Sequence, residues 1–86
     1  MGEELKEIED MEYILVTVKI GKGKDYELKI PAEITAGELV EMIEEAFRLN
    51  SMTKRSVHVE PLGRILGADE VLIEEGVYNG SQITLV

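Results

Sequence analysis

Three groups of residues in this 86-residue sequence have side chains that could do chemistry. The single histidine, His58, has no serine or cysteine nucleophile implied beside it, and the absence of cysteine excludes thiolate catalysis and Cys-ligated metals. Glu41, Glu44 and Glu45 suggest a metal or acid–base cluster, but helical spacing makes them a solvated face. The GKGK segment at 21–24 joins two predicted strands, so it is a hairpin turn and not a phosphate loop. We therefore expect no enzyme, no cofactor and no metal site.

Composition limits the class of partner. With 18 acidic and 9 basic side chains the net charge is −9, which opposes binding to nucleic acid and to anionic lipid. The longest apolar run is Ile14 to Val16, too short for membrane insertion, and no signal peptide is visible. A cysteine-free chain suits a reducing compartment, so we expect a small acidic cytoplasmic protein that binds other proteins.

Charge also divides the chain. Residues 1–12 hold six acids and one lysine. A short segment with like charges crowded together does not bury enough apolar surface to fold alone. We predict a flexible acidic tail at residues 1–11, followed by a single domain at residues 12–86.

The first half of the domain reads as a hairpin followed by a helix. Apolar residues alternate along 13–20 and 25–30, with glycines between them for the reversal. A helix is predicted at about 36–49, because Thr35 can cap it and Glu38 can close a capping box. Its predicted buried stripe consists of Ala36, Leu39, Val40, Ile43, Ala46 and Phe47.

The second half supplies three more strands, at 57–60, 64–66 and 81–86. Val71, Leu72 and Val77, in the irregular connection before the last strand, are expected to close one end of the core. The right-handed crossover rule places the last strand parallel to the first and beside it. The sequence therefore predicts an α+β fold of order β-β-α-β-β-β, with one mixed sheet packed on one helix, which is the β-grasp.

Two stretches carry a resemblance to a known family. ILVTVKIGKGKDYELKI resembles the opening hairpin of ubiquitin without a gap, and LIEEGVYNGSQITLV is similar to its closing loop and strand. The likeness covers about 13–86. Among ubiquitin-like proteins, the short second hairpin and GVYNGSQI most resemble the YukD-type (EsaB-like) proteins of bacterial type VII secretion. The resemblance implies a ubiquitin-like β-grasp and a non-enzymatic accessory or adaptor role in a secretion-type assembly.

The end of the sequence bears on a second possibility. Ubiquitin and the related ThiS and MoaD sulfur carriers end in a flexible Gly-Gly, whereas Leu85 and Val86 belong to the predicted strand. We therefore expect a protein that is not conjugated. The alternative is a ubiquitin-like modifier or a ThiS/MoaD-like sulfur carrier whose Gly-Gly tail is missing from this chain.

The resemblance further implies that the outer face of the sheet binds a protein. The candidate contact residues are Leu15, Thr17, His58, Glu60, Arg64, Thr84 and Val86. A central apolar contact of ubiquitin falls at the position of Glu60, so proteins that recognise ubiquitin are not expected to bind here. We expect Leu15 and Val86 to lie near each other if the first and last strands pair. Positive charge around them is expected from His58, Lys54, Arg55 and Arg64.

Two other interpretations of the surface stay open. The outer face is equally consistent with an ordinary half-polar sheet surface. A second candidate surface is the helix edge with Met42, Leu49 and Met52, although methionines also fill the margin of a core. The partner is an unknown protein, and we expect a monomer or a weak homo-oligomer.

Overall fold

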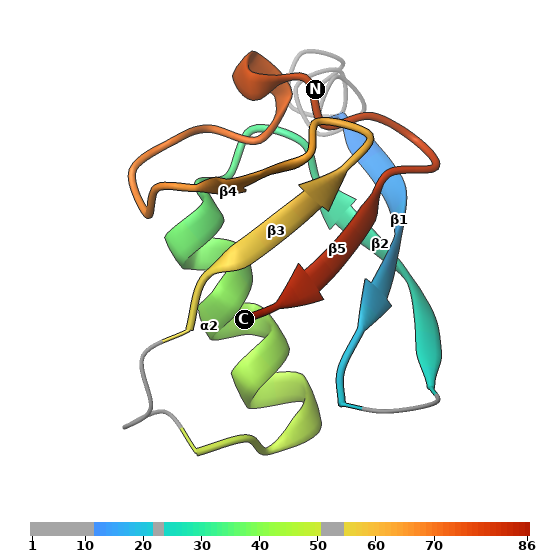
Figure 1. The fold of residues 1–86 in the computed structure, drawn as a ribbon, viewed down its shortest axis with the longest axis vertical. Coiled ribbons are helices and arrows are strands. Elements are labelled where there is room, and N and C mark those ends of the chain that lie inside the picture. Colours follow the sequence, from blue (N-terminus) through green and yellow to red (C-terminus); the bar gives the residue numbers. More distant parts are fainter. Residues whose placement is uncertain (1–11, 22–23, 51–54) are drawn as a thin grey trace, which may run out of the picture.

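The computed structural model describes residues 12–21, 24–50 and 55–86, and the predicted tail at 1–11 lies outside them. Its elements confirm the predicted order (Figure 1). They are β1 (Tyr13–Lys19), β2 (Asp25–Pro31), α2 (Ala36–Phe47), β3 (Val57–Glu60), β4 (Arg64–Leu66), the 3-10 turn η1 (Ile73–Glu75) and β5 (Gln82–Leu85).

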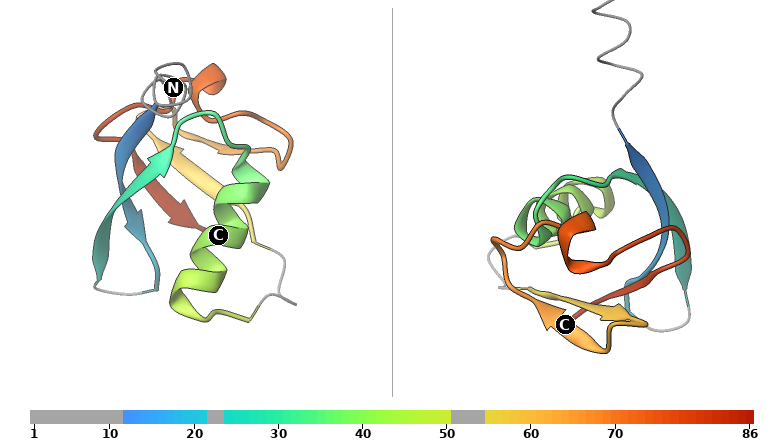
Figure 2. Two further views of the ribbon diagram at one scale, coloured as in Figure 1. Left: turned by 180° about the vertical axis from the view of Figure 1, so that it is seen from behind. Right: turned by 90° about the horizontal axis from the view of Figure 1, so that it is seen from above.

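The five strands form one mixed sheet in the order β2-β1-β5-β3-β4. β5 lies parallel to β1 and antiparallel to β3, so the prediction that the last strand lies beside the first is confirmed. Figure 1 looks onto the face of the sheet that α2 does not cover, and the view from behind in Figure 2 has α2 in front. We call the uncovered face the outer face.

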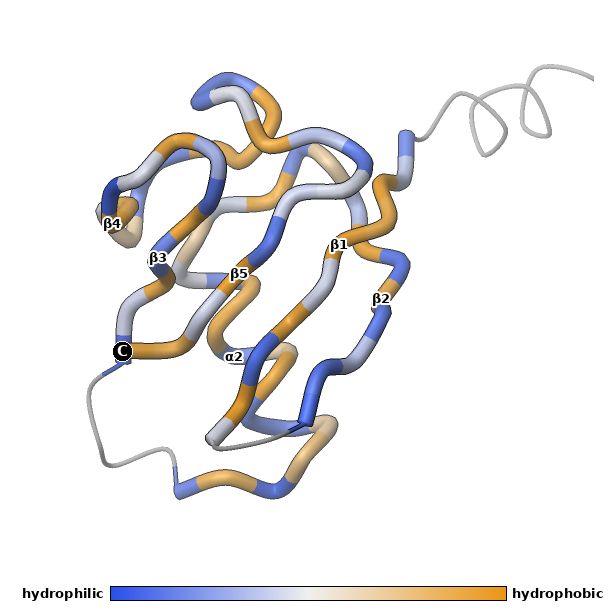
Figure 3. The backbone as a smooth tube through the Cα atoms, turned by 45° about the vertical axis from the view of Figure 1, so that its right-hand side comes forward, coloured by the Kyte–Doolittle hydropathy of each residue, from blue (hydrophilic) through white to orange (hydrophobic). Residues whose placement is uncertain are grey.

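The core lies between the inner face of the sheet and α2. From Val16 onward, apolar residues alternate with polar ones along β1, as the colours of Figure 3 show, and the inward residues of the strand are almost completely buried. Leu72 and Val77, both 0% exposed, close the end of the core beyond β4 as predicted, while Val71 is only half-buried and makes a backbone bridge to Thr35. The principal buried residues are Ile14, Val16, Val18, Ile30, Leu39, Ile43, Val57, Val59, Leu72, Val77 and Ile83.

Helix α2 begins as predicted. The Thr35 hydroxyl accepts a hydrogen bond from the Glu38 N–H, and the Glu38 carboxylate accepts one from the Thr35 N–H, which completes the capping box. The helix ends at Phe47 and not at residue 49, because Arg48 adopts a left-handed conformation with φ 56° and its N–H bonds back to the carbonyls of Glu44 and Glu45. No helix within the described ranges has the length and apolar content needed to cross a membrane.

The predicted buried stripe of α2 was wrong at one position. Ala46 is exposed, because it faces the hollow toward β2, the last strand of the sheet, and no described residue covers it there. Glu44, which we expected on the solvated face, is only 9% exposed. The buried face of the helix therefore extends toward β3 and leaves a shallow groove toward β2.

Candidate protein-binding surface

Strand register brings four outer-face side chains into one row across the sheet. Lys19 on β1 lies opposite Thr84 on β5, Thr84 lies opposite His58 on β3, and His58 lies opposite Ile65 on β4. Residues paired in this way have their side chains on the same face and in contact distance of one another. The neighbouring row consists of Thr17, Gln82 and Glu60.

Two large apolar side chains are exposed here, Ile65 at the β4 end of the row and Val86 next to the row. Ile65 is 52% exposed, and Val86 is 56% exposed although its backbone is fixed by two hydrogen bonds to Ser56, of 2.9 and 3.1 Å. Val86 stands diagonally from His58, at a spacing of about 7–8 Å. We call Lys19, His58, Ile65, Thr84 and Val86 the His58 patch.

His58 occupies the centre of the patch and is partly covered. Its side chain is 32% exposed, and its Nδ1 atom lies 3.6 Å from the Glu60 Oε2 atom two residues along the same face. This contact becomes an ion pair when the imidazole carries a proton. The patch therefore combines exposed apolar side chains with polar groups that can form hydrogen bonds, and protein contact surfaces contain both.

The expectation that Leu15 lies near Val86 was wrong. In the parallel pairing Lys19 lies opposite Thr84, so Val86 comes beyond the hairpin end of β1. Leu15 lies at the other end, where its N–H donates to the Asn79 side chain and its carbonyl accepts from the Gly80 N–H. The two side chains are about 20 Å apart along the strands, because each residue adds about 3.3 Å.

Arg64 does not belong to the outer face. It lies opposite Val59, whose side chain points into the core, so its own side chain leaves the sheet on the inner side at the β4 edge. There its guanidinium binds the carboxylates of Glu70, at 3.3 Å, and Glu75. The Gly67 N–H and this guanidinium both stabilise the Glu70 carboxylate, which lowers the pKa of Glu70.

The expectation that Arg55 supplies positive charge around the outer-face residues was also wrong. It lies toward α2, where its guanidinium is 2.8 Å from the Glu44 carboxylate and 2.6 Å from the Asn50 carbonyl. Lys54 and Met52, expected to contribute to the two candidate surfaces, lie outside the described residues. Because Arg55 and Arg64 are each paired with acids, neither supplies free positive charge to the outer face.

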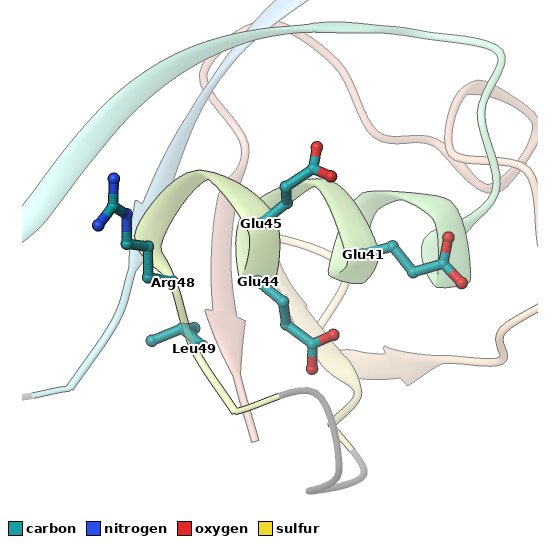
Figure 4. Close-up of a pocket in the computed structure, with 5 residues that line it drawn as sticks. All are labelled: Glu41, Glu44, Glu45, Arg48 and Leu49. Atoms are coloured by element: carbon teal, nitrogen blue, oxygen red, sulfur yellow. The ribbon is translucent and has the colours of Figure 1, made fainter.

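Figure 4 shows why Glu41, Glu44 and Glu45 of α2 do not form a ligand cluster. The carboxylates of Glu41, Glu44 and Glu45 point in three different directions around a hollow that Arg48 and Leu49 also line. Within the described residues, no three acidic or histidine side chains converge in the way a metal ion requires. Glu44 acts instead as the partner of Arg55.

Sequence reasoning missed Ile65 as a surface residue. The signal was present in the sequence. Leu66 is the apolar last residue of a three-residue strand, and if its side chain points into the core, strict alternation puts Ile65 on the outer face. The same alternation argues against Arg64 on that face. Assigning the inward residue of β4 first identifies both.

Comparison with solved structures shows the fold. The N-terminal ubiquitin-like domain of the 4931431F19Rik protein matches with a TM-score of 0.76 and 19% identity, over 90% of this chain and 76% of that one. The Caldiarchaeum subterraneum ubiquitin matches with a TM-score of 0.67 and 22% identity, over 86% and 91% of the two chains. The ubiquitin-like domain of the Mycobacterium tuberculosis type VII secretion system protein EccD1 matches with a TM-score of 0.64 and 22% identity, over 88% and 99%.

Comparison with sequences gives a narrower result. A search of characterised proteins gives no match to the chain. The sequence pattern of YukD, a protein of the WXG100 protein secretion system, matches residues 13–85, which span all five strands and the helix. The resemblance found in the hairpin and the closing strand is therefore confirmed, and the chain belongs to the YukD family of ubiquitin-like proteins.

Proposed function

We propose that this chain is a cytoplasmic, non-enzymatic, non-conjugated accessory protein of a secretion-type assembly, which binds a protein partner through the outer face of its sheet. The observation that carries the proposal is the exposure of Ile65 and Val86 on either side of His58. Membership in the YukD family supports the setting. The likeness to the EccD1 domain is one of fold alone.

The chemistry of the outer face indicates what the partner surface looks like. The His58 patch offers two apolar side chains with a hydroxyl, an imidazole and an ammonium group around them. Thr17, Glu60 and Gln82 extend it with polar contacts toward Leu15. A partner surface with apolar groups on either side of a polar group, and further polar groups around them, matches this arrangement.

The test is recovery of the other secretion components of the same genome with the tagged full chain. We expect Ile65→Asp to lower recovery about tenfold or more, because a carboxylate buried in the interface costs more than about 1 kcal/mol. Leu15→Asp is the matched control, since Leu15 is similarly exposed, at 47%, on the same face but far from the patch. Equal loss with both variants would indicate a contact spread over the whole outer face, and unchanged recovery with Ile65→Asp would contradict the proposal.

The alternative function as a modifier or sulfur carrier has its own measurement. Intact-mass analysis of the protein from its native source shows whether it carries a C-terminal thiocarboxylate, a Gly-Gly extension or a link to lysine. The proposal expects none of these masses. Finding one would replace the accessory role with carrier or modifier chemistry.

A further inference from the structure

The edge of the sheet at β2 presents backbone groups that no described strand pairs with. β2 is the terminal strand, and β1 is its only neighbour among the described residues. Leu15 and Thr17 direct their backbone N–H groups toward the β5 side, where they bond to Asn79 and Ser81. Val16, which lies between them, therefore directs its backbone N–H and C=O groups toward β2.

The direction of the outward groups follows from the register. Leu15 lies opposite Lys29, and Thr17 lies opposite Glu27. In an antiparallel pair, residues that face each other either both bond across the pair or both point away from it. Since Leu15 and Thr17 point away from β2, Glu27 and Lys29 point their N–H and C=O groups out of the free edge.

An apolar groove runs beside this edge on the inner face of the sheet. Leu28 and Ile30 of β2 form one wall, Leu39, Met42, Ile43 and Ala46 of α2 form the other, and its volume is about 150 Å³. Met42 is 42% exposed and Leu28 is half-buried, so the groove has apolar surface left uncovered. Figure 2, seen from behind, shows β2 at one margin of the sheet and α2 to its side, in front of the other strands. A strand added to the edge would direct alternate side chains into this groove.

The charges around the groove select the partner. Glu38, Glu41 and Glu45 are exposed on α2, and with Met42 and Ile34 they line an adjoining hollow of about 300 Å³. On β2, the side chains of Glu27 and Lys29 lie opposite Thr17 and Leu15 on the outer face, so the acids that border the groove are those of α2. The border of the groove is therefore acidic and complementary to basic side chains.

The same charges disfavour two other occupants. Residues 1–12 hold six acids and one lysine, so they are repelled by the acids of α2. A second copy of the chain brings a further net charge of −9. We propose that the β2 edge and the β2–α2 groove bind an extended segment of a partner protein, which joins the sheet as an additional strand, places apolar side chains in the groove and carries basic residues at the neighbouring positions that face α2.

The proposal is tested by NMR titration of the full chain with a peptide of about eight residues, which has valine or isoleucine at the central positions that face the groove and lysine at the outer positions on the same face. We expect shifts at the amides of Glu27 and Lys29 and at the methyl of Met42, slower hydrogen exchange at the two amides, and weaker binding at higher salt. The same peptide with glutamate in place of lysine should bind at least about tenfold more weakly.

Two pairs of variants separate strand addition from general charge attraction. Lys29→Pro removes the outward N–H without removing a bond to β1, whereas Lys29→Ala keeps that N–H, so only the proline should weaken binding, by about fivefold or more. Met42→Glu should abolish binding, while Ile65→Asp on the outer face should leave it unchanged. This control also distinguishes the present proposal from the function proposed above.

Several results would overturn the proposal. They are absence of binding at about 1 mM peptide, equal binding of the glutamate peptide, and shifts confined to the outer face. Sedimentation of the free chain as a dimer that Met42→Glu dissociates would assign the edge to a second copy. Binding that occurs only after removal of residues 1–11 would assign the groove to the chain's own N-terminal segment.

Discussion

At the scale of single residues, the charged side chains of this protein divide into those that hold the fold and those left for contact. Glu44 and Arg55 belong to the first group, because their side chains are only 11% and 19% exposed and their ion pair is 2.8 Å long. Arg55 also binds the Asn50 carbonyl, so one guanidinium contacts both the last turn of α2 and Asn50 in the connection that follows the helix. A buried carboxylate of this kind is stable only while its partner remains.

Replacing Arg55 with methionine tests this role. Arg55→Met leaves the Glu44 carboxylate buried without its partner, and we expect the free energy of unfolding to fall by about 1–3 kcal/mol. Adding Glu44→Gln should restore part of the loss, because a neutral amide costs less to bury than a charge. Urea denaturation measures both, with Glu45→Gln on the exposed side of the helix as the control, which is expected to stay within about 0.5 kcal/mol. If Arg55→Met and the control have the same free energy of unfolding, the Glu44–Arg55 ion pair does not contribute to stability.

At the scale of elements, the sequence predicted what local patterns determine. Period-two alternation located β1 and β2, and Thr35 with Glu38 located the start of α2. The position of Leu15 relative to Val86 was wrong, because the offset between two parallel strands far apart in the chain leaves no local signal. The partners of Arg55 and Arg64 were missed for the same reason, since three-dimensional neighbours and not sequence spacing select them.

The connection after β4 gives the element-scale prediction. Arg64, Glu70 and Glu75 fasten this connection to the edge of the sheet, and Glu70 also accepts a hydrogen bond of 2.7 Å from the Gly67 N–H. These contacts hold Leu72 in place at the end of the core. They favour the ionised form of Glu70, so its pKa in the folded protein lies below the ordinary value of 4.5.

The sign of the pH dependence follows from that lowered pKa. Glu70 stabilises the folded state above the unfolded pKa, near pH 4.5, and the stabilisation is lost as the pH falls through the lower folded pKa. We expect Glu70→Gln to melt below the wild type at pH 7 and the gap to close on acidification. Thermal melts across this range, with the exposed neighbour Glu74→Gln as the control, measure the effect. A gap that stays constant from neutral to acidic pH would mean that the Glu70 charge contributes nothing.

At the scale of the whole molecule, β5 joins two hairpins that local contacts alone leave separate. It lies between β1 and β3, so the β1–β2 hairpin and the β3–β4 hairpin belong to one sheet only through the last strand. The outer face depends on this junction, because Lys19 comes from one hairpin and His58 and Ile65 come from the other. The β2 edge depends on it too, since β1 is held in place by β5. Both proposed binding surfaces therefore require the strand that closes the fold.

Substitution of Ile83, which lies at the centre of β5 and is 0% exposed, tests whether both binding surfaces depend on β5. Ile83→Ala removes apolar volume between the two hairpins and α2, and we expect a loss of about 2–5 kcal/mol of unfolding free energy. If the sheet unfolds as one unit, native-state hydrogen exchange of Val16 in the first hairpin and Val59 in the second should lose protection by the same free energy. Gln82→Ala, exposed on the same strand, should change neither by more than about 0.5 kcal/mol. Loss of protection at Val59 with Val16 unaffected would show instead that the first hairpin and α2 form a stable unit without β5, and that the β2 edge remains intact when the outer face is lost.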